Sequence, residues 1–141
     1  MKNIFIALFM LFSIICKSQT KKNDFENNQK QLKRVWMLIE FKDFKKSDLI
    51  KNQAQLNLKN FKNPSAFAGC NQINFTMKIE KNKIKFNNII STEMFCDSKM
   101  ELENAFSKSL SNNFKFLIKG HTLTLTNSKN EKMVFVAQDW D

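Results

Sequence analysis

The sequence has few of the residues that interrupt helices and strands, and few of those that form disulfides or bind metal ions. Its 141 residues include 2 glycines, 1 proline, 3 cysteines, 1 histidine and no tyrosine. So little glycine and proline excludes collagen-like and low-complexity proteins. Three cysteines exclude a disulfide-dense small protein, and an odd number does not suit a secreted protein whose cysteines are all paired. Hydrophobic residues make up 43% of the chain, which excludes a disordered tail, and the length allows one domain.

Residues 1–18 have the pattern of a signal peptide. Lys2 supplies a positive start, and an apolar run over residues 4–15 is broken only by Ser13. The run has the length of a signal-peptide core and falls short of the roughly 20 apolar residues that a membrane span needs. We predict cleavage after Ser18 and export to the periplasm or the medium.

A lipid anchor through Cys16 is the alternative. Cys16 directly follows the apolar run, as the modified cysteine of a lipoprotein does, but Ile15 is bulkier than the small residue expected before such a cysteine. The alternative location is therefore the membrane surface of the envelope.

Removal of residues 1–18 changes both the charge and the cysteine count. The two lysines of this segment lower the formal net charge from +10 to +8, and its cysteine leaves Cys70 and Cys96 as an even pair. The next residues are polar and bury little apolar surface. We therefore divide the rest of the chain into a flexible polar leader, one folded domain and a short tail: residues 19–33, 34–137 and 138–141.

Short alternations of apolar and polar residues predict strands in the domain. Residues 35–41 form the first strand, with Trp36 turned inward, and the lysine-rich residues 42–52 are predicted to be a loop. Leu56 and Leu58 mark a second strand. Residues 73–79 and 84–86 then form a hairpin pattern, in which Asn82 is expected to adopt a positive φ.

One helix interrupts the strands. Ser98 and Glu101 have the spacing of a capping box, and Leu102, Phe106 and Leu110 then form one apolar stripe. Further strands are predicted over residues 114–118, 123–125 and 133–136. The order strands–helix–strands predicts the α+β class, a single β-rich domain in which one helix packs on an antiparallel curved sheet.

Five motifs occur in a characteristic order. They are Trp36-Met-Leu, Phe67-Ala-Gly-Cys-Asn-Gln, Ile90-Ser-Thr-Glu-Met-Phe-Cys, Glu103 on the helix, and Leu123-Thr-Leu-Thr. Their order and spacing over residues 34–137 resemble the META domain, the HslJ-like heat-shock family. The resemblance implies a small β-rich domain, exported or lipid-anchored and linked to stress resistance or secretion, with no established reaction. Asn74 and Asn130 stand at or near two glycines of the family, since asparagine is the next-best residue for a positive φ.

The resemblance places Cys70 and Cys96 at matching motif positions. In an exported protein this suggests a disulfide, which would stabilise the fold by about 3 kcal/mol in the chain-entropy account. Two buried free thiols that fill core volume are the alternative. The other motif or structural positions are Trp36, Gly69, Asn71, Ser91, Thr92, Met94 and Glu103.

Two polar motif residues have ordinary structural interpretations. Residues 69–72 are interpreted as a turn in which Asn71 bonds to nearby amides, with one wall of a ligand surface as the alternative. Glu103 is expected on the solvated face of the helix, near an N-terminus that favours negative charge.

We predict no catalytic residue, no metal site and no cofactor. His121 is the single histidine and lies in a predicted turn, so no pattern pairs it with a cysteine as a cysteine hydrolase requires. Two cysteines and one histidine lack the fourth ligand and the close spacing of a structural zinc site.

The positive charge is lysine spread along strands rather than arginine gathered in a patch. Arg34 is the single arginine, whereas nucleic-acid readers rely on arginine, and Lys78, Lys83 and Lys115 alternate with apolar residues. We expect a solvated sheet face, no nucleic-acid partner, and a weak attraction to anionic membrane surfaces that salt screens.

These observations predict a non-enzymatic, monomeric protein of the cell envelope. Its expected role is that of a stress-related or protein-binding module whose partner is an unidentified envelope protein. The alternative is a binder of a small apolar molecule or lipid, with a pocket inside the sheet built from phenylalanine and methionine. An enzyme comes third, and it would need Cys70 or Cys96 within hydrogen-bond reach of His121.

Overall fold

The computed structural model describes residues 26–96 and 100–140. Residues 26–32 are helical, at the end of the segment that we predicted as a leader. The chain from Leu32 onward forms one compact unit. The predicted signal peptide and the predicted N-cap, Ser98, lie outside the described residues. No helix within the described ranges is long and apolar enough to cross a membrane.

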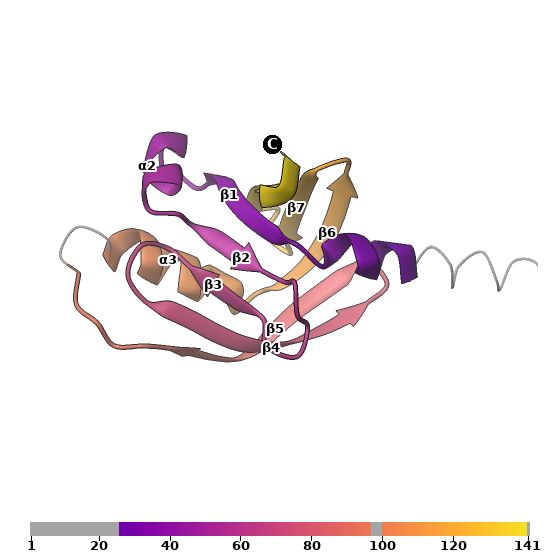
Figure 1. The fold of residues 1–141 in the computed structure, drawn as a ribbon, viewed down its shortest axis with the longest axis horizontal. Coiled ribbons are helices and arrows are strands. Elements are labelled where there is room, and N and C mark those ends of the chain that lie inside the picture. Colours follow the sequence, from indigo (N-terminus) through magenta and orange to yellow (C-terminus); the bar gives the residue numbers. More distant parts are fainter. Residues whose placement is uncertain (1–25, 97–99, 141) are drawn as a thin grey trace, which may run out of the picture. The chain divides into compact units, whose positions relative to one another are not determined.

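Eight strands of the described chain follow one another around a closed antiparallel barrel (Figure 1). They are β1 (Val35–Phe41), β2 (Gln55–Asn57), β3 (Ser65–Phe67), β4 (Gln72–Glu80), β5 (Lys83–Ser91), β6 (Asn113–Lys119), β7 (Thr122–Asn127) and β8 (Lys132–Ala137). The helices are α2 (Lys46–Lys51), α3 (Met100–Leu110) and the short 3₁₀ helix η1 (Gln138–Trp140). The predicted β-rich architecture with one long helix between strands is therefore confirmed.

The sequence predicted a curved sheet, whereas the structure has a sheet that closes into a barrel. The last strand, β8, pairs antiparallel with β1, and Leu38 lies opposite Phe135. Closure satisfies the backbone groups that a sheet edge would leave unpaired. Alternation along a strand identifies its inward face, but it does not reveal that the first and last strands meet.

Three local predictions were wrong. The lysine-rich segment predicted as a loop contains α2, a six-residue helix with only Leu49 buried, so it has no apolar stripe to identify it. The β4–β5 turn takes its positive φ, 55°, at Lys81 rather than Asn82. Asn74 lies inside β4, and the left-handed residue nearby is Asn88, with φ 51° in β5.

In the β7–β8 turn, an asparagine adopts the positive φ that the sequence predicted. Asn130 adopts φ 63°, as predicted for a residue in place of glycine. The Asn127 Oδ1 accepts hydrogen bonds from the amides of Lys129 at 2.9 Å and Glu131 at 3.0 Å. The side chain of Asn127 thus substitutes for backbone partners within the turn.

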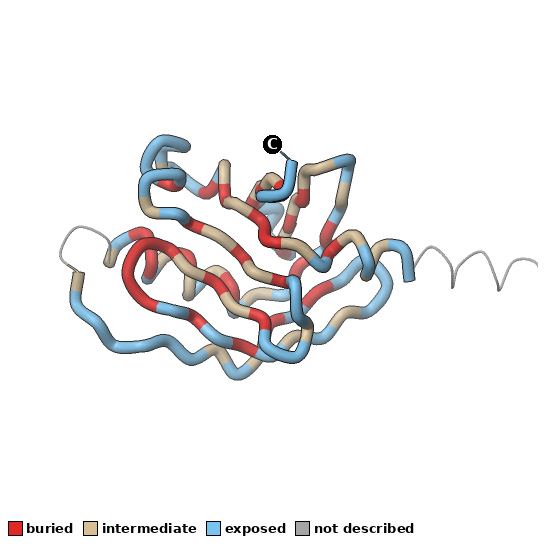
Figure 2. Tube along the Cα trace, in the orientation of Figure 1, coloured by how far each residue is buried: buried red, intermediate tan, exposed pale blue. Residues whose placement is uncertain are grey.

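The barrel interior is filled with large apolar side chains. Buried and exposed positions alternate along the strands, as the tube in Figure 2 shows. Trp36 is fully buried, and its Nε1 donates to the Leu32 carbonyl at 3.0 Å. Phe106 of α3 packs edge-on against Phe41 of β1, with ring centroids 5.9 Å apart, and 6.5 Å from Phe135 of β8. The predicted apolar stripe of α3 therefore faces the barrel core.

Candidate functional site

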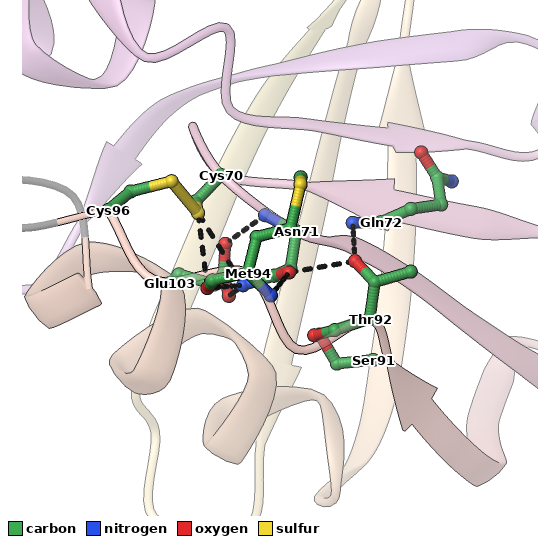
Figure 3. Close-up of a disulfide and its surroundings, with 8 residues drawn as sticks. All are labelled: Cys70, Asn71, Gln72, Ser91, Thr92, Met94, Cys96 and Glu103. Atoms are coloured by element: carbon green, nitrogen blue, oxygen red, sulfur yellow. Dashed lines mark hydrogen bonds between the residues drawn. A yellow bond between two sulfur atoms is a disulfide. The ribbon is translucent and has the colours of Figure 1, made fainter.

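Cys70 and Cys96 form a disulfide with a Cα–Cα distance of 6.1 Å (Figure 3). The bond joins the segment between β3 and β4 to the segment between β5 and α3. Gly69 precedes it with φ 111°, and a Cβ there would lie 2.8 Å from Asn52 Oδ1, so only glycine fits. Of the two interpretations of this cysteine pair, the disulfide is confirmed.

Asn71 is the centre of a buried hydrogen-bond network. Its Oδ1 accepts from Thr92 Oγ1 and from the Met94 amide, both at 2.7 Å. Its Nδ2 donates to the Met94 carbonyl at 2.9 Å and to Glu103 Oε1 at 2.7 Å. All four bonds of the side-chain amide are made, and Asn71 is only 2% exposed. The predicted local turn bonding was wrong, because these partners lie 21 to 32 residues away along the chain.

Glu103 is buried rather than solvated, which corrects the prediction for this residue. It is 4% exposed, and its Oε2 accepts from the Asn71 amide at 2.5 Å while Oε1 accepts from the same residue's side chain. Glu103 lies in the first turn of α3, where the helix N-terminus favours negative charge. Helical spacing places it beside Leu102 and Phe106, at the edge of the apolar stripe, and its hydrogen bonds join it to Asn71, just before β4.

Two hydroxyl residues of the motif have different roles. Thr92 extends the β4–β5 pairing, since its Oγ1 accepts from the Gln72 amide and its own amide donates to the Gln72 carbonyl, both at 3.2 Å. Ser91 is exposed, and its Oγ donates to the neighbouring Thr92 carbonyl at 3.1 Å. Trp36, another motif residue, lies in the barrel core.

The disulfide and the hydrogen bonds of Asn71 join six residues into one cluster. We call this cluster the clasp; it consists of Cys70, Asn71, Thr92, Met94, Cys96 and Glu103.

The clasp holds a segment whose side chains are exposed. Asn71 binds both backbone groups of Met94, and the disulfide fixes Cys96 two residues later. The Met94 side chain is nevertheless 57% exposed and that of Phe95 is 80% exposed. Phe95 was not among the predicted site residues, although it stands in the motif next to Cys96, four residues after the end of β5.

The structure provides neither a cysteine–histidine pair nor a metal site within the described residues. Both cysteine sulfurs are bonded to each other, so neither is a thiolate nucleophile. His121 lies elsewhere, with its Nδ1 3.4 Å from Arg34 Nη1 and its ring centroid 3.5 Å from that of Trp140, the two rings tilted by 42°. The described residues contain no group of three or more His, Cys, Asp and Glu side chains that could hold a metal ion.

Two hollows lie outside the clasp. The larger, of ≈ 510 Å³, is lined mainly by lysine and asparagine residues of β4 to β7 and the β7–β8 turn. The smaller, of ≈ 260 Å³, lies beside α2 and β1. Neither has the phenylalanine- and methionine-lined interior that the apolar-ligand alternative requires.

Comparison with known proteins places this geometry among related folds. A family model for the META domain matches residues 30–140. An NMR structure of a protein from Burkholderia xenovorans is 16% identical with a TM-score of 0.61, covering 79% of this chain and 86% of the other. A second protein solved by NMR is 18% identical with a TM-score of 0.63, covering 79% of this chain and 95% of the other. These likenesses show the shared fold. No curated protein matches the chain.

Proposed function

This chain belongs to the META domain family, and from that premise we propose that it is a non-enzymatic protein-binding module of the cell envelope. It acts in stress resistance, and its contact surface is centred on Met94 and Phe95. The observation that carries the proposal is a fixed backbone bearing exposed apolar side chains at these two positions.

A rigid apolar contact is suited to protein recognition. Burying a phenylalanine or methionine side chain contributes about 1.5–3 kcal/mol. Much of that gain is lost when a flexible loop must first be ordered, so prior fixation of the backbone raises affinity. Asn71 and the disulfide provide that fixation for residues 92–96.

The disulfide also supports export. Disulfides form and persist outside the reducing cytosol, and Cys70 and Cys96 are bonded here. A fold cross-linked at its binding surface keeps that surface ordered when the envelope is exposed to heat or denaturants, which is the physical basis for a stress role.

Site-directed photo-cross-linking in the native envelope tests the contact surface. A photoreactive phenylalanine analogue at Phe95 is expected to give one discrete protein adduct. The matched control is the same analogue at Leu117, an apolar β6 side chain that is 53% exposed. Adducts of equal yield at both positions, or none at Phe95, would contradict the proposed surface.

The location has a separate test. The intact mass of the protein isolated from its native envelope, with and without reductant and alkylation, is expected to show loss of residues 1–18, no lipid and no free thiol. A lipid-modified Cys16 would place the protein at the membrane surface instead.

A further inference from the structure

The larger hollow is a basic groove on the outside of the barrel. Its volume is ≈ 510 Å³, and four lysines line it: Lys78, Lys83, Lys85 and Lys115. Asn113 and Ser128 supply neutral hydrogen-bond donors at its wall. We call these four lysines and their hollow the lysine groove. None of its residues belongs to the clasp.

Strand register places the four lysines opposite one another in two pairs. Lys78 of β4 lies directly opposite Lys85 of β5, and Lys83 of β5 lies directly opposite Lys115 of β6. Like charges directly opposite on neighbouring strands are destabilising. The barrel thus contains two lysine pairs across neighbouring strands, and Glu80 of β4 lies directly opposite Lys83 of β5.

The acidic residues near the groove do not neutralise it. Glu80 is the single carboxylate that lines it, and its Oε1 lies 2.7 Å from Lys78 Nζ. The hydrogen bond to Glu80 raises the pKa of Lys78; Lys78, and to a smaller extent Lys83, lower the pKa of Glu80 in return. Among the described residues, Lys83, Lys85 and Lys115 have no carboxylate within 4.0 Å.

We propose that the lysine groove is a binding site for the phosphate groups of an anionic ligand. A phosphate group accepts hydrogen bonds through several oxygens, and a phosphomonoester carries about −1.5 to −2 charges, so it can bridge several ammonium groups. Lysine binds phosphate as a compact point charge and needs no bidentate geometry. The volume falls in the range of ligand sites, roughly 300–1,000 Å³, and leaves room for more than one phosphate group.

Phosphate groups in the envelope come from two sources. One is a soluble phosphorylated molecule, and the other is the headgroup of an anionic phospholipid. Both present the same oxygens to Lys83, Lys85 and Lys115, so the experiment uses one probe for each source.

The first arm titrates the full-length mature protein with inorganic pyrophosphate at low ionic strength, followed by amide chemical shifts. Shifts are expected in β4, β5 and β6 around the groove. The variant Lys83→Gln, Lys85→Gln, Lys115→Gln is expected to weaken binding at least about tenfold. A control with the same net charge, Lys46→Gln, Lys59→Gln, Lys62→Gln, replaces three exposed lysines elsewhere and is expected to change affinity less than about twofold.

The second arm measures co-sedimentation with vesicles of phosphatidylglycerol and phosphatidylcholine, and with vesicles of phosphatidylcholine alone. Binding to the anionic vesicles that pyrophosphate displaces, and that the groove variant loses, identifies a lipid headgroup. Pyrophosphate binding without vesicle binding identifies a soluble ligand.

Failure of the proposal is distinct from failure to fold. The groove variant removes repulsive pairs and is expected to melt at the temperature of the parent protein or higher. Equal losses in the groove and control variants, or no binding in either arm by a folded parent protein, would overturn the proposal.

Discussion

At the scale of single residues, Asn71 does more than fill a turn. One buried amide, just before β4, connects its own segment of chain to the segment after β5 and to α3. A buried network of this kind stabilises strongly when every group is satisfied and costs stability when one partner is lost. Among the described residues, no buried side-chain nitrogen or oxygen lacks a partner.

Replacement of Asn71 by aspartate is the sharpest test of this network. Asn71→Asp keeps the shape but exchanges the donor facing Glu103 for a second carboxylate oxygen, so two buried acids face each other. We expect a loss of about 3 kcal/mol or more in the free energy of unfolding, measured by urea denaturation. The exposed control Asn104→Asp on α3 should change it by less than about 0.5 kcal/mol. Similar values for both variants would show that the network contributes nothing.

Glu103 tests the same network from the helix side. Its two oxygens accept from two donors of Asn71, whereas glutamine offers one acceptor and one donor. Glu103→Gln is therefore expected to cost about 1–3 kcal/mol of unfolding free energy. Glu101→Gln, on the exposed side of the same helical turn, is the control and should be near neutral. A stability unchanged by Glu103→Gln would be at odds with the buried double contact.

At the scale of elements, the disulfide joins two cysteines that lie outside the helices and strands, Cys70 just before β4 and Cys96 after β5. It encloses the whole β4–β5 hairpin, because its cysteines lie 26 residues apart, before β4 and after β5. The hairpin itself could be predicted from alternation over residues 73–86. Which loops it brings together depends on the pairing of β3 with β4 and on the position of α3.

Removal of the cross-link should destabilise the domain without unfolding it. Cys70→Ser with Cys96→Ser is expected to lower the free energy of unfolding by about 3 kcal/mol, since the unfolded chain regains the entropy of a closed loop. Reductant should lower the stability of the parent protein by a similar amount and leave the double variant unchanged. A double variant as stable as the oxidised parent would show that the bond has no energetic role.

The lysine pairs on β4, β5 and β6 lead to a prediction of the opposite sign, a gain in stability when one lysine of a pair is replaced. Lys115 lies opposite Lys83 on β5 and opposite the neutral Thr126 on β7, so Lys115→Gln should raise the unfolding free energy by about 0.2–1 kcal/mol at low ionic strength. The gain should shrink at about 1 M salt, where the Debye length falls to about 3 Å. Thermal melts at both salt concentrations measure the difference, with Lys59→Gln as the control. A loss of stability at low salt would mean that the pair does not repel.

At the scale of the whole molecule, the pairing of β8 with β1 turns a series of hairpins into a barrel. Met133, Phe135 and Ala137 of β8 are all buried, and Phe135 lies opposite Leu38 of β1. The closing strand therefore completes both the hydrogen-bond ladder and the core. Without it, β1 and β7 would each have an unpaired edge.

Truncation tests the closure. A chain ending at Glu131 lacks β8 and is expected to lose cooperative thermal unfolding, because two edges and much of the core become exposed. A chain ending at Ala137 lacks residues 138–141, which include η1, a helix with no buried residue, and should unfold cooperatively. Both outcomes can be read by circular dichroism. Cooperative unfolding of the shorter chain would show that the barrel does not need its closing strand.

Sequence alone determined the local structure where side-chain alternation was strong. The span of β1, the β4–β5 hairpin, the apolar stripe of α3 and the last three strands follow from apolar spacing, because burial on one face repeats every second residue in a strand and every three or four in a helix. The family motifs also identified Cys70, Asn71, Thr92, Met94, Cys96 and Glu103. Their common location did not follow from spacing.

Tertiary structure decided what those residues do. Glu103 is a charged residue of the kind that usually lies on a helix surface, yet its hydrogen-bond partner lies 32 residues away, and only folding places the two together. The same is true of Phe95, whose exposure depends on a clasp made by residues before β4 and on α3. Barrel closure and the lysine groove likewise arise from strand register, which is set by packing across the whole sheet.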